Sequence, residues 1–188
     1  MRKQLYLAII AQLKLIKKDE DGKYYTWVQP TPVQGEPPVV QPASAIKHFD
    51  IWNNNLQYIE ETPPFDCPAV FLQFQPITWE ARSKGVRGAD VSVTFHVITA
   101  NRAPSAKEHN FEEKALAFFD LLDAINYNLY NLKGDFFRYL TSAGSATDHD
   151  HDELIDSMET YTVQVTDNSA VKILPTLPVT PIVNTEFK

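Results

Sequence analysis

The sequence has little glycine and only one cysteine. Its 188 residues include six glycines, and none lies in the GxxxxGK[ST] or GxGxxG pattern that holds nucleotide phosphates. A P-loop or Rossmann-type nucleotide enzyme is therefore not expected. Cys67 has no second cysteine with which to form an internal disulfide, which fits a reducing compartment. With 44% hydrophobic residues, the chain still has enough apolar material for one folded core.

Long apolar runs are also missing. No stretch approaches the roughly 20 apolar residues that a bilayer-spanning helix needs. Gln12 and Lys14 interrupt the apolar residues that follow Arg2 and Lys3, and no small-residue cleavage site comes after them. We therefore expect a soluble intracellular protein rather than a secreted or membrane protein.

Basic residues are absent from one long segment. Between Arg138 and Lys172 there is no lysine or arginine, while seven acidic residues lie there. Those seven account for the whole formal net charge of −7, so the rest of the chain is neutral. The net acidity argues against a general nucleic-acid binder, which needs clustered cations to neutralise phosphates. We call residues 139–171 the acidic stretch.

Hydrophobic periodicity predicts both helices and strands. Apolar residues at three- and four-residue steps predict helices over 2–17, 45–60 and 107–131. Alternating or β-branched and aromatic runs predict strands over 24–29, 69–74, 91–97, 136–142 and 155–166. In the strand over 91–97, the odd-numbered residues form one buried face, and His96 lies on the other face.

Prolines divide the rest of the chain. Five prolines make residues 30–44 an extended loop that we expect to lie along the surface. Three further prolines, spaced by three, predict an extended polyproline-like tail over 171–188. Residues 1–170 are then expected to form a single α+β domain. Its antiparallel or mixed sheet would have four to five strands, with helices packed on one face.

The segment from Asp148 to Glu153 gathers carboxylates and imidazoles, which are metal ligands. In an extended chain, however, its aspartates point one way and its histidines the other. The glycine and glutamate of an EF-hand loop are missing, and so is HExxH. We expect a solvated turn without metal or cofactor. The side chains that would bind a metal, if one were bound, are His149, Asp150, His151 and Asp152.

Residues suited to nucleophilic catalysis are scarce. There is no GxSxG motif. Cys67 is expected to be a small buried hydrophobe, and His96 a packing residue of the sheet. Trp27, Trp52 and Trp79 are expected to anchor a core or an interface. We therefore predict no catalytic residue.

The order of motifs along the chain is more distinctive than any single site. It runs CPAVFLQF (67–74), a Trp–Gly turn, VSVTFHVIT (91–99), a long helix, ATDHDHDEL (146–154) and METYTVQVTD (158–167). Over about residues 2–167 this resembles the tail-terminator or tail-completion proteins of long-tailed phages and prophages. The residues that carry the resemblance, called the pattern residues below, are Pro68, Phe71, Trp79, Gly85, His96, Asp148, His151, Leu154 and Tyr161. The proline-rich loop and tail depart from the family's pattern.

The resemblance implies a virion structural protein without enzymatic activity. Such proteins assemble as rings, typically hexamers, that cap the tail tube and join it to the head, at the tail terminus or in the neck. The partners would be further copies of this chain, tail-tube proteins and head-connector proteins, with no membrane. The chain would be made in the cytoplasm of the bacterial host and would end in the virion tail. DNA would only pass through the lumen, and the acidic stretch would suit the lumen wall because negative charge repels phosphate.

Two other functions stay open from the residues themselves. One is a small metal-dependent enzyme that uses the turn from Asp148 to Glu153 together with His96. The other is a protein-interaction module that presents the PxxPxxP tail to a partner groove.

Overall fold

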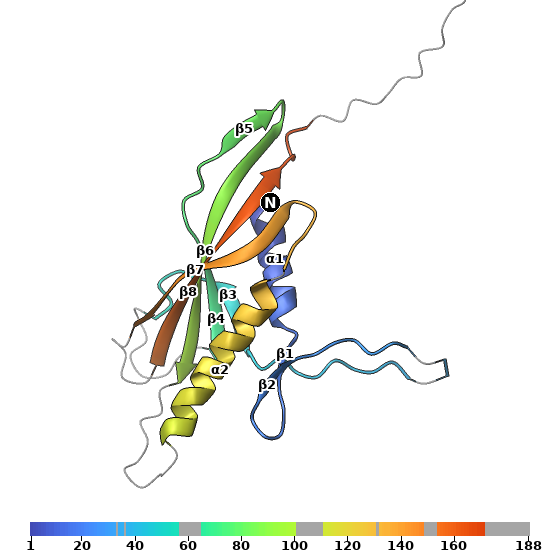
Figure 1. Ribbon diagram of the computed structural model, residues 1–188, viewed down its shortest axis with the longest axis vertical. Helices are drawn as coiled ribbons and strands as arrows, with labels where there is room; N and C mark the ends of the chain where they lie inside the picture. The colour runs from blue at the N-terminus through green and yellow to red at the C-terminus, as the bar shows by residue number, and fades with distance from the viewer. Residues whose placement is uncertain are drawn as a thin grey trace, which may run out of the picture.

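The structure, a computed structural model, describes residues 1–32, 34–35, 37–56, 65–100, 111–130, 132–148 and 154–171, with only the backbone at 111–117. These residues form two helices and eight strands (Figure 1). The helices are α1 (Arg2–Leu13) and α2 (Phe111–Tyr130). The strands are β1 (Ile16–Lys18), β2 (Tyr24–Thr26), β3 (His48–Ile51), β4 (Ala69–Phe74), β5 (Glu80–Ser83), β6 (Val86–Ala100), β7 (Phe137–Asp148) and β8 (Leu154–Asp167).

A six-stranded sheet organises the fold around β6. The strand order is β3-β4-β6-β8-β7, and β5 pairs with the part of β6 that β4 leaves free. β6 is 15 residues long and pairs antiparallel with β8 from Arg87 opposite Asp167 to Ala100 opposite Leu154. β3 and β4 are parallel, so the sheet is mixed. β1 and β2 form a separate antiparallel ribbon beside α2.

Both helices cover one face of this sheet. Every third or fourth residue of each helix is buried, and these side chains pack on the odd-numbered residues of β6 in one apolar core. The helix residues buried in this core are Leu5, Ile9, Ile10, Leu13, Leu121, Ile125 and Leu129. The prediction of an α+β fold with helices on one face is confirmed.

The opposite face, here called the back face, has its own small core. Phe71, Ile98 and Leu154 are buried there with Leu56 and Ala69, under the partly buried Trp52, Phe65 and Cys67. The segment that contains β3 supplies this cover. Because His96 and Ile98 are buried as well, the prediction of a single buried face for the strand over 91–97 is wrong.

Other predictions also need correction. The sheet has six strands rather than four to five, partly because β5 replaces a predicted turn. In place of a helix over 45–60, residues 48–51 pair with β4, and Asn54 has a left-handed φ of 52° that interrupts helical geometry. The helix predicted over 2–17 ends at Leu13, because Ile16–Lys18 pairs with β2. Residues 57–64, and the tail beyond 171, lie outside the described residues.

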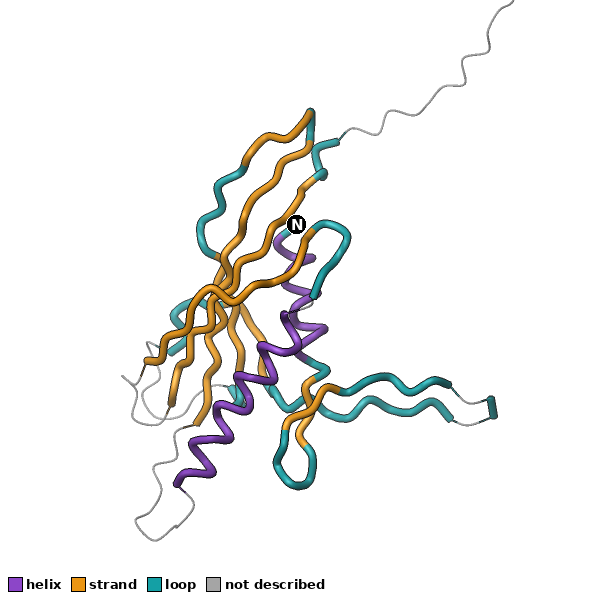
Figure 2. The backbone as a smooth tube through the Cα atoms, in the orientation of Figure 1, coloured by secondary structure: helices purple, strands orange, loops and turns teal. Residues whose placement is uncertain are grey.

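Residues 28–43, here called the arm, protrude from the body of the molecule as two limbs (Figure 2). Every described residue of the arm is exposed, so the expected course along the surface is wrong. The base of the arm is held firmly by Lys17. Its buried ammonium group donates hydrogen bonds to the Lys14 carbonyl at 2.7 Å and to the Pro42 carbonyl at 2.6 Å. Burial also lowers the pKa of Lys17.

Candidate functional site

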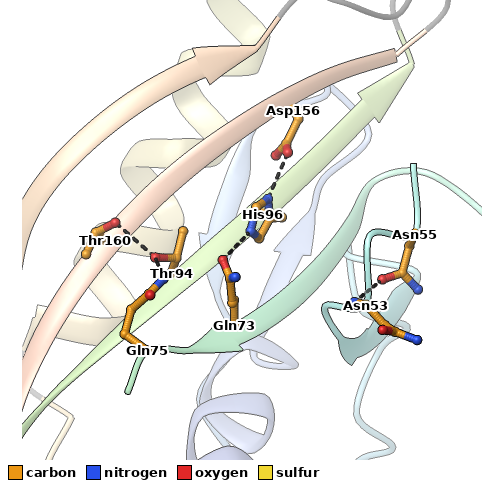
Figure 3. A network of polar contacts seen from close by, with 8 residues as sticks. All are labelled: Asn53, Asn55, Gln73, Gln75, Thr94, His96, Asp156 and Thr160. Atoms are coloured by element: carbon orange, nitrogen blue, oxygen red, sulfur yellow. Dashed lines mark hydrogen bonds and ion pairs between the residues drawn. The ribbon is translucent and has the colours of Figure 1, made fainter. Parts of the chain in front are cut away.

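A cluster of polar side chains lies on the back face of the sheet, where the sequence predicted only packing. It consists of Gln73 from β4, His96 from β6, Asp156 from β8 and Trp52 from the segment after β3 (Figure 3 shows the first three). We call these four residues the back-face cluster. β4, β6 and β8 are neighbours in the sheet, and even-numbered residues of β6 and β8 stand opposite one another. Side chains from all three strands therefore converge on the His96 ring.

The His96 ring is enclosed on both edges and over one face. Nδ1 lies 2.8 Å from Asp156 Oδ2, and Nε2 lies 3.2 Å from Gln73 Oε1. The indole of Trp52 stacks on the imidazole with 3.7 Å between ring centroids and 3° between planes. Both side chains of the His96–Asp156 pair are only 5% exposed. The second carboxylate oxygen of Asp156 is buried and finds no partner among the described residues.

A second set of hydrogen-bonded polar side chains lies on the back face, beginning two residues before His96 on β6. Thr94 and Thr160 stand opposite each other on β6 and β8, with 3.2 Å between their hydroxyl oxygens. The Gln75 amide donates to the Thr94 hydroxyl at 3.4 Å (Figure 3). In the loop after β3, the Asn53 backbone N–H donates to the Asn55 side chain at 2.6 Å. This Asn turn shapes the loop that carries Trp52.

An aspartate–histidine pair is the arrangement that orients an imidazole as a general base. Here, however, the outer nitrogen of His96 is occupied by Gln73, and Trp52 covers the ring. Among the described residues, no hydroxyl or thiol makes a hydrogen bond to His96. Instead, the stacking of Trp52 on His96 holds the segment after β3 against the middle of the sheet.

Cys67 lies at the edge of the back-face core. It is half-buried, free, and joined to Pro68 by a cis peptide bond. Burial raises the pKa of its thiol, and Asp66 raises it further. A raised pKa disfavours the thiolate that a nucleophile requires, so the geometry supports the predicted structural role.

The proposed metal ligands cannot be placed. His149, Asp150, His151 and Asp152 lie outside the described residues. Within the described part of the chain, no group of three or more His, Cys, Asp or Glu side chains could hold a metal ion. His96, which the metal-enzyme alternative requires, is already engaged with Asp156 and Gln73.

A second polar centre lies at the far end of β6. The Arg87 guanidinium donates to Asp167 at 2.9 and 3.1 Å and sits over the Trp79 ring, 4.1 Å from its centroid. The hairpin turn into β6 contains Gly85 at φ 79°, and a Cβ atom there would lie 2.8 Å from the Ala170 carbonyl oxygen. Gly85 is thus required both by its backbone angle and by the close approach of the chain after β8.

The described part of the acidic stretch does not form an exposed acidic surface. Asp156 is paired with His96, and Asp167 with Arg87. Glu159 accepts a hydrogen bond from the Ser145 hydroxyl. Two of the seven acidic residues are therefore buried among hydrogen-bond donors rather than turned toward solvent.

Replacing Asp167 with asparagine should lower the free energy of unfolding by about 1 kcal/mol at pH 7, since Arg87 is half exposed and the pair is partly screened. Hydrogen bonds from Ser169 and Arg87 lower the pKa of Asp167 from 3.8 to about 2. Its contribution is therefore present above about pH 4 and is lost as the pH falls through about 2. Urea unfolding at several pH values would measure it. A difference between wild type and variant that stays constant down to about pH 2 would contradict this assignment.

The pattern residues separate into groups. Phe71, His96 and Leu154 come together on the back face, and Pro68 precedes the strand that carries Phe71. Trp79 and Gly85 both lie in the hairpin region at the far end of the sheet. Tyr161 lies on the helix-covered face, where its hydroxyl donates to Asn126 of α2 at 3.3 Å, and Asp148 ends β7 half-buried. His151 is outside the described residues.

Sequence reasoning missed three members of the back-face cluster: Trp52, Gln73 and Asp156. The sequence shows Asp156 only as one member of the acidic stretch, and its periodicity places Trp52 in the helix predicted over 45–60. The available signal was the alternation of β6 and β8 considered together. A buried histidine on a strand needs a partner on a neighbouring strand, and Asp156 is an even-numbered residue of β8.

No protein-family model matches this chain, and no curated protein is significantly similar to it. In the described residues, neither helix is long and apolar enough to cross a lipid bilayer.

Proposed function

We propose that this chain is a structural subunit of a phage or prophage virion, similar to tail-terminator and tail-completion proteins. It forms a ring at the end of the tail tube and joins the tail to the head. The arm supports an assembly role directly, although this proline-rich loop departs from the pattern of the family. A protruding segment with exposed apolar residues, anchored at its base, is typical of a surface that another protein covers.

The arm exposes three valines: Val28 at 77%, Val39 at 56% and Val40 at 85%. The five prolines of the segment stiffen its backbone and thereby reduce the entropy that is lost on binding. Lys17 fixes the limb that returns to the body at Pro42. In a ring, the arm would reach over the neighbouring copy.

The sheet edge at β7 gives independent support. β7 is 12 residues long and mostly exposed, and its outer side pairs with no other strand in the described part of the chain. Natural sheets usually block such edges with lysines, prolines or a covering loop. Here Arg138 is the only cation in the strand. An open edge of this kind suits a protein whose final form is an assembly.

For the acidic stretch we propose a narrower role than a continuous lumen wall. Asp156 and Asp167 are buried, so any repulsion of DNA would come from the other acidic residues of the stretch. Their negative charge would discourage DNA from binding.

The experiment is to measure the mass of the purified chain by native mass spectrometry and light scattering over a range of concentrations, with electron microscopy of the largest species. We expect a closed ring. A variant in which residues 30–41 are replaced by a short Gly-Ser linker should keep its fold but lose at least about tenfold in association. A wild-type chain that is monomeric throughout, also when mixed with phage tail tubes, would contradict the proposal.

A further inference from the structure

The outer face of α2 carries an exposed stripe of aromatic and acidic side chains. Phe119 is 57% exposed, Tyr127 is 75% and Tyr130 is 59%, and Asp120 and Asp123 lie exposed between them. We call these five residues the acidic–aromatic stripe. The helix has no cation from 118 to 130. Large exposed rings grouped on one helix face are typical of an interface rather than of a solvated surface.

A hollow of about 520 Å³ adjoins this stripe, between β2 and α2. Its walls include the rings of Tyr24, Tyr25 and Tyr127, with Asp120 and Asp123 on the α2 side and Lys23 at its border. A hollow with aromatic walls and carboxylates on one side would accept an apolar side chain that is flanked by cations.

The outer face of α1 has the opposite character. Lys3, Leu7 and Lys14 follow one another at spacings of four and seven residues, so they lie in one line along the helix. All three are exposed, and Leu7 is 53% exposed although it is aliphatic. α1 contains no acidic residue. We call these three residues the basic stripe.

We propose that copies of this chain associate head to tail, with the basic stripe of one copy on the acidic–aromatic stripe of the next and Leu7 seated in the hollow beside α2. The stripes have matching lengths, since Lys3–Lys14 and Phe119–Tyr130 each span about 16 Å at 1.5 Å per residue. Their charges are opposite, and lysine ammonium groups also bind favourably over tyrosine and phenylalanine rings. The inference rests on the proposed ring and identifies the surfaces that join its subunits.

The same charges disfavour contacts in which a stripe meets the identical stripe of another copy. Two copies joined through α2 would bring four aspartates together, and two joined through α1 would bring four lysines together, which is repulsive. The favourable contact joins two different surfaces of the same chain. A contact of this kind repeats from copy to copy, and it closes into a ring when the rotation between neighbours allows it.

A charge swap tests the contact. In one variant, Asp120→Lys and Asp123→Lys make both stripes basic; in the other, Lys3→Glu and Lys14→Glu make both acidic. Each variant alone should lose at least about 100-fold in association, because every contact becomes repulsive. An equimolar mixture should assemble again, with the two variants alternating, since each contact then joins opposite charges. Native mass spectrometry of the mixture would show equal numbers of both variants in each ring.

The matched control for the Asp120→Lys/Asp123→Lys variant is Glu20→Lys with Asp21→Lys in the exposed turn between β1 and β2, which changes the net charge by the same amount and in the same direction. It should assemble like the wild type, and circular dichroism should show that every variant is folded. The inference is overturned if either swapped variant alone assembles like the wild type, or if the folded variants fail to assemble when mixed. If the wild type forms rings in those cases, the proposed function stands without this contact; if the wild type forms none, both fail.

Discussion

Asp156→Ala is expected to lower the free energy of unfolding by about 3 kcal/mol, the cost of leaving a buried polar group without its hydrogen-bond partner. The substitution leaves the Nδ1 edge of His96 facing a void in a region where both side chains are 5% exposed. Trp52, stacked on the same ring, would lose the orientation that Asp156 gives to the imidazole. The back-face cover would therefore loosen together with the pair.

A double-mutant cycle measures the interaction between His96 and Asp156 apart from the other contacts of each side chain. The cycle compares His96→Leu and Asp156→Leu with the double variant. The double should lose less stability than the sum of the two singles, because neither member of the pair stays buried without the other and only the partly buried Gln73 loses a partner. Urea unfolding of the two singles and the double would give the coupling energy. Asp123→Ala, at an exposed position on α2, should change the stability by less than about 0.5 kcal/mol. If the loss of stability in the double variant equalled the sum of the losses in the two single variants, the two side chains would not be coupled.

Phe71→Ala should cost about 3–5 kcal/mol, as expected for a large aromatic side chain removed from a core. Phe71 is fully buried, and its ring contacts Phe65 at 4.9 Å, His48 at 5.4 Å and Trp52 at 6.1 Å between centroids. The back-face core is small, so it has few other side chains with which to fill the cavity. Loss of this one ring should release the segment after β3 from the sheet.

Phe119→Ala is the matched control, because it deletes the same side chain from a position that is 57% exposed. At protein concentrations where the chain is monomeric, it should change the free energy of unfolding by less than about 0.5 kcal/mol. Thermal and urea unfolding of both variants would measure the contrast. Limited proteolysis should also cut Phe71→Ala faster than Phe119→Ala within residues 48–56. Equal and small losses of unfolding free energy in both variants would show that the back-face core contributes little to the stability of the fold.

Elements with strong local patterns could be predicted from the sequence. The strands 69–74 and 155–166 and the longest helix have clear periodicity, and the structure has β4, β8 and α2 at these places. Tyr161, Val163 and Val165, which alternate along the strand predicted over 155–166, are all buried. In these segments, local propensity and tertiary packing favour the same structure.

Elements whose structure depends on distant partners could not be predicted. Residues 48–51 have apolar spacing that suits a helix, yet they form a strand because the exposed edge of β4 offers parallel pairing. As a result, the Trp52 indole stacks on the His96 imidazole and does not lie on a helix face. Periodicity within one segment carries no information on which strand edge lies nearby, so the back-face cluster could not be foreseen.

The pattern residues, which carry the phage resemblance, do not gather at one surface. Phe71, His96 and Leu154 meet on the back face, yet their contacts are those of a structural core. The surfaces proposed for assembly, the arm and the two stripes, include none of the pattern residues. Prolines mark the arm in the sequence, whereas the helix residues that form the two stripes could be identified only from their exposure in the structure.

The long pairing of β6 with β8 also sets the order in which the molecule can fold during synthesis. α2 and β7 lie between these two strands in the chain, so β6 leaves the ribosome well before its partner exists. α2 needs only local contacts and can form early, whereas the centre of the sheet must wait for the last strand. Until then the apolar strand edges are uncovered, and a nascent chain stalled before Leu154 should depend on chaperones.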